Sequence, residues 1–250
     1  MAGHSKWANI KHKKGAADAK RGKIFSKISK EITVAVRIGG PDADSNPRLR
    51  AAIVLGRAQN MPNDVITRAV KKGTGDLGGA IPEDLSYEGY GVDGVAILVD
   101  VLADNRNRAA TDIKMIFNKN HGSLGNSGSV SWMFHRKSQF IIEGEKADEE
   151  LLMDIVLDAG AEDINVEDGI AEILGPQDCF EAVTNALAEA GIETISASVS
   201  KLPDSTIKVE SVASLKKILH LIDVLENNED VQAVYSNYEA DDDIMAEAMQ

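Results

Sequence analysis

The sequence predicts an α+β protein, an N-terminal three-helix bundle followed by two ferredoxin-like α/β domains, one inserted in the other. Within residues 16–73, apolar residues recur at three- and four-residue spacings, as on one face of a helix. From residue 94 onward, short β-branched apolar runs alternate with helical segments, as strands and helices do in α/β domains. A chain of 250 residues is long enough for domains of this number and size.

Three helices are expected in the helical domain, residues 16–78. The first starts at residue 16 and ends at the Gly39–Gly40 pair, with apolar residues on one face and lysines on the others. The second follows Asn46, a good N-cap, and Pro47, which suits a first turn. The third begins at Pro62 and ends at Gly73. Their short connections predict a small bundle.

The glycine-rich stretch KKGTGDLGGAIPED (71–84) is predicted to be an exposed loop. It contains GTGDLG, which matches the spacing of the dinucleotide-binding motif G-x-G-x-x-G. That motif requires a strand before it and a helix after it. Here a helix precedes the glycines and Pro82 follows them, so we expect no nucleotide site.

The order β-α-β-β-α-β is expected twice in the rest of the chain. The inserted domain, 137–202, contains QFIIEG, DEELLMDIVLDAG, the hairpin INVEDGIAEILG, PQDCFEAVTNALAEAG and ETISASVSKL. The outer domain, 79–136 plus 203–238, has strands at 94–102, 129–134, 206–210 and 231–238, with helices at 106–119 and 211–226. Residues 239–250 are expected to be an acidic tail that need not pack.

Charge is strongly segregated along the chain. The net charge is −13, yet residues 1–80 contain sixteen Lys and Arg against six Asp and Glu. Such asymmetry is typical of proteins that present one end to a polyanion, because phosphate repels the acidic remainder. The alternative is that the basic end docks on the acidic domains of its own chain.

The chain shows no motif of catalysis or metal binding. Its five histidines and single cysteine form no H-x-x-x-H or Cys/His cluster, and no G-x-S-x-G, P-loop or kinase motif is present. Cys179 lies among apolar residues and is interpreted as a small buried side chain. No run of 18 apolar residues predicts a membrane span. We therefore expect no enzyme activity, no metal, no cofactor and no small-molecule substrate.

The strongest functional candidates lie in and just after a basic arm, residues 1–15. Lysines neutralise phosphates, and an exposed indole can stack on a base. The alternatives are that the lysines are merely solvated and that the tryptophan packs on the bundle. The candidate nucleic-acid-binding residues here are Lys6, Trp7, Lys11, His12, Lys13, Lys14, Lys20, Arg21 and Lys23.

A second basic site stands out in the acidic part of the chain, in DNRNR (104–108). Arg106 and Arg108 lie at the start of a predicted helix, where a cation opposes the helix dipole. A contact with a nucleic-acid partner would explain that cost. Pairing with Asp104 and Asp112 is the alternative.

The motifs GHSKWANIKHKKG, GGPDADSNPRLRAAI, MPNDVITRAVKKG, YEGYG, DNRNR and GSVSWMF resemble those of the YebC family, from the first residues to about Tyr238. The resemblance implies a helical domain, two α/β domains and a cytoplasmic location. It departs mildly at Val92-Asp93 and Asn120-His121, which affects loop geometry. Bacterial members are mostly called probable transcriptional regulators, and mitochondrial relatives are translational activators.

The resemblance thus implies a regulator of gene expression with two candidate targets. The first is promoter DNA, bound through the basic N-terminal region. The second is ribosomal RNA on the ribosome, where the protein would aid translation of difficult, proline-rich sequences. The sequence contains no recognisable recognition helix, which favours the second target.

Overall fold

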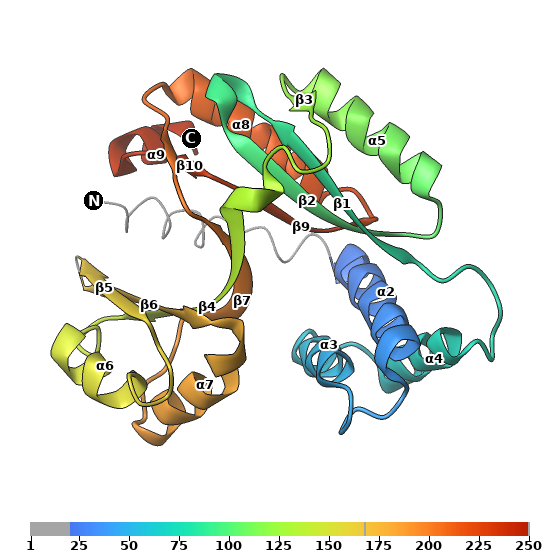
Figure 1. Ribbon diagram of the computed structural model, residues 1–250, viewed down its shortest axis with the longest axis horizontal. Helices are drawn as coiled ribbons and strands as arrows, with labels where there is room; N and C mark the ends of the chain where they lie inside the picture. The colour runs from blue at the N-terminus through green and yellow to red at the C-terminus, as the bar shows by residue number, and fades with distance from the viewer. Residues whose placement is uncertain (1–20, 168, 250) are drawn as a thin grey trace. The chain divides into compact units, whose positions relative to one another are not determined.

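The computed structural model describes residues 21–167 and 169–249 (Figure 1). The chain divides into two compact units, each built from separate stretches. One unit contains residues 21–130 and 216–236. The other contains residues 131–215 and 237–249. Each unit is described by itself.

The helical domain consists of α2 (Arg21–Gly39), α3 (Pro47–Ala58) and α4 (Asn63–Thr74). Asn46 caps α3 as expected, because its side chain accepts the backbone N–H of Leu49. The three helices share an aliphatic core. That core includes Ile28, Ile32, Val36, Leu49, Ala52, Met61, Ile66 and Ala69.

The third helix ends one residue later than predicted, at Thr74, and Gly73 stays helical. A Cβ on Gly73 would lie 2.6 Å from Cβ of Val36, so glycine is needed here for the close approach of α4 to α2. The left-handed position that terminates the helix belongs to Gly75, with φ of 92°.

The first four-stranded sheet has the order β3-β1-β2-β9, and all neighbouring strands are antiparallel. Its strands are β1 (Glu83–Tyr90), β2 (Ala96–Ala103), β3 (Ser123–Leu124) and β9 (Val231–Ser236). Helices α5 (Arg106–Lys119) and α8 (Val212–Glu226) lie on one face of it. They meet at Gly122, where the side chains of Phe117 and Leu221 both approach the backbone.

Sequence analysis was wrong about part of this sheet. Strand β1 was not predicted, and residues 129–134 are a loop followed by the 3-10 turn η3 (Ser131–Met133) rather than a strand. The carboxylate of Glu88 holds that loop, since it accepts the backbone N–H groups of Gly128 and Val130, each at 2.7 Å. The order in this sheet is therefore β-β-α-β-α-β. A second short 3-10 turn, η2 (Val92–Gly94), joins β1 to β2.

The second four-stranded sheet has the order β5-β6-β4-β7 and is also antiparallel throughout. Its elements are β4 (Phe134–Glu143), α6 (Glu149–Val156), β5 (Asp163–Glu167), β6 (Ile170–Pro176), η4 (Gln177–Cys179), α7 (Phe180–Glu189) and β7 (Ser196–Pro203). This is the predicted β-α-β-β-α-β arrangement. Helices α6 and α7 pack on one face through a core that includes Phe140, Ile142, Leu152, Ala171 and Val183 (Figure 1).

Two further elements differ from expectation. Strand β8 (Ile207–Lys208), predicted to join the outer sheet, pairs in parallel with β10 (Tyr238–Glu239) in a separate two-stranded sheet. The end of the chain was expected not to pack, but it forms α9 (Asp242–Ala248), in which Met245 is 1% exposed. The acids at 241–243 stabilise the first turn of that helix, while the methionine buries its apolar face.

Candidate nucleic-acid interface

Most of the predicted arm contacts lie outside the described residues. These are Lys6, Trp7, Lys11, His12, Lys13, Lys14 and Lys20. Arg21 is the first residue of α2, and its side chain is likewise outside the described part. The structure describes the side chains of Lys23, Arg106 and Arg108.

Lys23 belongs to a lysine stripe, Lys23, Lys27 and Lys30, on one face of α2. The ammonium groups of these lysines donate to the carbonyl oxygens of Asn227 at 3.2 Å, Glu226 at 2.9 Å and Glu229 at 2.9 Å, respectively. The acceptors lie at and just after the C-terminal end of α8, where free carbonyls carry negative partial charge. The stripe therefore caps a helix of its own chain.

Asp230 is the buried centre of this contact. Its side chain is 4% exposed, and its carboxylate binds Nζ of Lys30 at 2.5 Å and Nη2 of Arg108 at 2.8 Å. Its backbone carbonyl also accepts the N–H of Leu102, at the end of β2. One carboxylate thus joins the helical bundle, α5 and the sheet.

Arg108 and Arg106 have different environments. Arg108 binds Asp104 at 3.0 Å as well as Asp230, and the charge of Asp230 raises the pKa of this guanidinium. Arg106 has an exposed side chain, and its backbone carbonyl accepts the hydroxyl of Tyr87 at 3.4 Å. Arg108 therefore fits the pairing alternative, while Arg106 points to solvent.

Arg48 is a second cation used within the chain. Its Nε lies 2.6 Å from Oε1 of Glu31, and its Nη1 lies 2.8 Å from Oδ2 of Asp84. Hydrogen bonds to Glu31 and then to Asp84 raise the pKa of the guanidinium further above its already high value. This side chain ties α2 and α3 to the start of β1.

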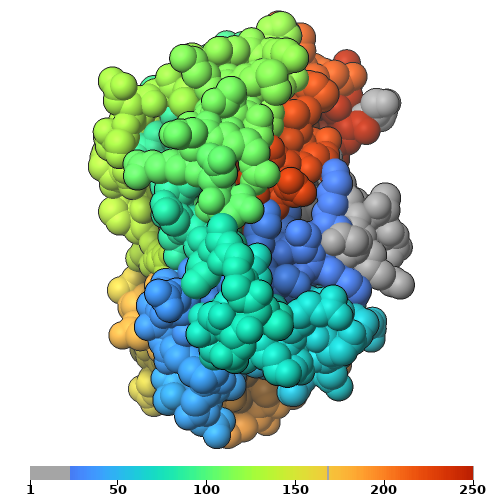
Figure 2. Space-filling model, turned by 90° about the vertical axis from the view of Figure 1, so that its right-hand side faces the viewer, coloured from blue at the N-terminus to red at the C-terminus, as the bar shows by residue number. Residues whose placement is uncertain are grey.

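Other cations of the helical domain are turned to solvent. We call Arg37, Arg57, Arg68 and Lys71 the exposed cations. Arg68 makes only a long contact of 4.0 Å to Asp64, with both side chains 72% exposed. Helices α2–α4 form the blue to teal surface in Figure 2. This surface can take phosphate without first breaking an ion pair that holds the fold together.

The uncovered face of the second sheet is unlike that of an RNA-binding sheet that stacks bases. Its two central strands present Gln139, Ile141, Glu172 and Leu174 on that face, and no aromatic side chain. Gln139 donates to Oε1 of Glu172 at 2.6 Å. Because sheets of the RRM type stack bases on aromatics, this face does not fit that mode.

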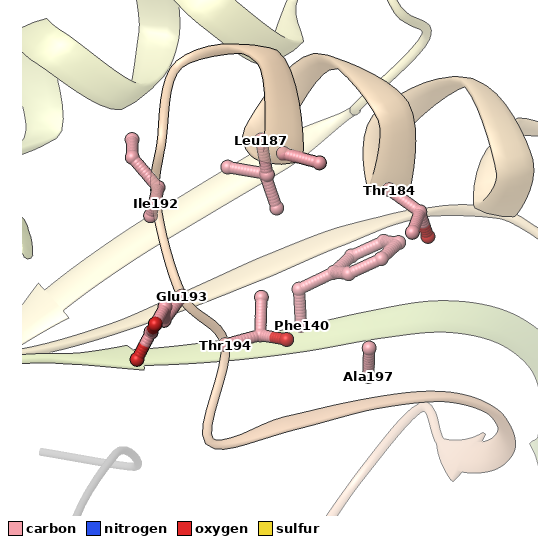
Figure 3. Close-up of a pocket in the computed structure, with 8 residues that line it drawn as sticks. Phe140, Thr184, Leu187, Ile192, Glu193, Thr194 and Ala197 are labelled. Carbon is pink, nitrogen blue, oxygen red and sulfur yellow. The ribbon is translucent and has the colours of Figure 1, made fainter.

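A small pocket of about 340 Å³ lies between α7 and the start of β7 (Figure 3). Buried Phe140, Leu187 and Ile192 form its floor, and Thr184 and Glu193 stand at its rim. The lining offers apolar contact but only one titratable group. Nothing in this pocket pairs an acid with a base or a nucleophile.

Within the described residues, no group of three or more His, Cys, Asp or Glu side chains is placed to hold a metal ion. None of the helices in residues 21–167 and 169–249 has both the length and the apolarity that a bilayer crossing requires.

Sequence analysis missed two features of possible functional weight. Asp230 lies in an acidic run, ENNED, that gives no sign of which acid is buried. Trp132 was assigned to a strand but lies on η3 with 64% of its surface exposed. The tryptophan next to glycines and serines in GSVSWM was the available signal of a turn.

Comparison with known proteins identifies the relatives of this chain. Residues 5–76 match the profile of the TACO1/YebC protein N-terminal domain, and residues 82–238 match that of the TACO1/YebC second and third domain. The chain belongs to the TACO1/YebC family.

Relatives within the TACO1/YebC family are similar over their whole length. A protein of Syntrophotalea carbinolica named "Probable transcriptional regulatory protein" is 52% identical over 249 residues, covering 100% of both chains. One of Treponema pallidum with the same name is 52% identical, covering 95% of this chain and 96% of its own. The crystal structure of a conserved hypothetical protein from Aquifex aeolicus matches with a TM-score of 0.78 and 38% identity, covering 90% of this chain and 93% of the other.

Proposed function

We propose that this protein is a non-enzymatic regulator of gene expression that works in the cytoplasm and binds nucleic acid through its basic N-terminal region. The observation that supports this most is the separation of two kinds of cation in the helical domain. Lys23, Lys27 and Lys30 are engaged by the protein, whereas the exposed cations project from the same small bundle into solvent. The names of the relatives support regulation of transcription, and hence promoter DNA as the first candidate target.

The charge distribution supports a polyanion as the partner. The helical domain and the arm carry the excess of Lys and Arg, while the rest of the chain is strongly acidic. A duplex or folded RNA would attract the first and repel the second, which orients the protein on binding. Ribosomal RNA is the second candidate, since none of the described helices contacts a partner in the way a recognition helix does in a dimeric repressor.

The arm is tested by measuring how binding changes with salt. Replacing Lys11, Lys13 and Lys14 by alanine is expected to reduce the slope of log K against log salt by about 2.7 on duplex DNA, or about 2.1 on a single strand. The matched control replaces Lys146, Lys216 and Lys217, three lysines of the acidic part of the chain. An equal slope in wild type and the arm variant would exclude the arm as the contact surface.

Sedimentation of a cell lysate separates the two targets. Co-migration with ribosomes that is lost after RNase treatment supports the RNA target. A protein that remains at the top of the gradient and crosslinks to discrete DNA sites supports the promoter target.

A further inference from the structure

Trp132 is an exposed aromatic side chain on a turn between two domains of the sequence. It lies in the middle of η3, and 64% of its surface is exposed. Burying a tryptophan removes a large apolar area from water, so leaving one outside forgoes substantial stabilisation. An exposed indole is therefore a feature that calls for an explanation by a partner.

The turn that carries Trp132 is fixed to the inserted domain by the next residue. The backbone carbonyl of Met133 accepts the N–H of Asp204 at 2.9 Å, and its sulfur accepts the amide of Asn237 at 3.7 Å. Strand β4 then begins at Phe134. A rigidly based indole loses little conformational entropy on binding, which is what a stacking platform requires.

Two cations lie close by on the first residues of the same sheet. Arg136 and Lys201 are direct cross-strand partners on β4 and β7, so their side chains share a face. Like charges directly opposite each other destabilise a sheet. The acid nearest in sequence, Asp204, is engaged by Nε2 of His135 at 2.7 Å. An anion placed between Arg136 and Lys201 would offset their repulsion.

We propose that Trp132, Arg136 and Lys201 form a second nucleic-acid contact, which stacks an unpaired base on the indole and binds the adjacent phosphate with the two cations. This inference rests on the proposed function and extends it to single-stranded nucleic acid. A single strand is required because the face of a base is hidden inside a duplex. Stacking and cation contacts together are the usual means of binding single strands without sequence preference.

Fluorescence of Trp132 reports the contact directly. The chain has two tryptophans, so Trp7→Phe leaves Trp132 as the sole indole. The full-length variant is titrated with an oligouridylate that carries fluorescein at one end, and anisotropy of the label gives the bound fraction independently. We expect quenching of Trp132 in proportion to the bound fraction, and no such quenching with duplex DNA.

Affinity measurements on further variants complete the test. Trp132→Ala is expected to weaken oligouridylate binding by roughly 10-fold, while Trp132→Phe retains most of the affinity because the ring can still stack. Replacing Arg136 and Lys201 by glutamine is expected to reduce the salt slope by about 1.4. Leu157→Ala, which alters a side chain 60% exposed in the same domain, is the control and is expected to change neither quantity.

The possible failures can be told apart. Oligouridylate binding without quenching of Trp132 overturns this inference and leaves the proposed function standing. Quenching by polyglutamate but not by oligouridylate also overturns it, since the surface would then serve an acidic protein. Absence of any binding to DNA or RNA by the full chain overturns the proposed function together with this inference.

Discussion

Two groups of cations in the helical domain differ in what they face. Lys23, Lys27 and Lys30 follow one another at helical spacing and cap the end of α8. The exposed cations, Arg37, Arg57, Arg68 and Lys71, face solvent on all three helices. The difference shows that a count of basic residues overstates the surface available to a nucleic acid, because part of that charge is used inside the protein.

Asp230→Asn should give the largest effect, and it acts on the internal group alone. Losing this carboxylate leaves Lys30 and Arg108 facing each other without a counter-charge. We expect the free energy of unfolding to fall by about 3 kcal/mol, as for a broken buried ion pair. Urea denaturation measures it.

The control for that experiment is Asp241→Asn, which removes the partner of Lys208 at a surface where both side chains are more than half exposed. Exposed pairs contribute less than about 1 kcal/mol. Equal losses in the two variants would contradict the central role given to Asp230.

Replacing the four exposed cations by glutamine should have the opposite profile. We expect the salt slope for duplex DNA to fall by up to about 3.6, while each substitution changes stability by no more than about 0.5 kcal/mol. Lys27→Gln is the internal counterpart, and it should lower stability with little change in the slope. The comparison fails if Lys27→Gln reduces the slope as much per charge as the exposed set does.

Arg106 and Arg108 repeat the comparison within a single helical turn. Arg108→Gln removes one of the two partners of Asp230 and should lower the free energy of unfolding by about 1.5 kcal/mol, since that bond is to a charged group. Arg106→Gln should leave stability unchanged and weaken nucleic-acid binding. Urea denaturation and anisotropy on the same two proteins would show whether the roles are reversed.

The smallest effect concerns Tyr87, beside this site. Burial raises the pKa of its hydroxyl from the ordinary value of 10.0, helped by Asp230 and opposed by Arg106. The folded state thus favours the neutral phenol, so the stabilisation is present below pH 10 and is lost as the pH rises above it. Tyr87→Phe should remove this part of the decline. The readout is the difference between the urea midpoints of the two proteins as the pH is raised, and a constant difference would contradict it.

Local signals account for the parts of the fold that the sequence predicted. The caps and apolar stripes of α3 and the inserted β-α-β-β-α-β unit are each encoded within short segments. Strand β1 was missed because EDLSYEGY begins with acids and places Gly89 on the sheet face that meets α5. A Cβ on Gly89 would lie 2.6 Å from the ring of Phe117, so the strand owes its place to packing rather than to β-propensity.

The site was less predictable because its contacts join distant segments. The spacing of Lys23, Lys27 and Lys30 indicates one helix face, but the acceptors lie about 200 residues later in the chain. Docking of the basic end on its own acidic segment had been an open alternative, and it holds for these three lysines. Trp132 could not be assigned to a turn from its own β-forming neighbours, since Glu88 diverts the preceding backbone into a loop.

The position of β9 has a consequence for synthesis of the chain. Strand β2 pairs with β1 on one side and with β9 on the other, yet β2 ends at residue 103 and β9 begins at residue 231. At ordinary translation rates, the interval between the two is on the order of ten seconds. During that time the inserted sheet can be completed, while the apolar edge of AILVDVLA lacks its last neighbour. An open apolar edge is a site of aggregation, so slow elongation through residues 104–230 is the period in which the nascent chain most needs protection.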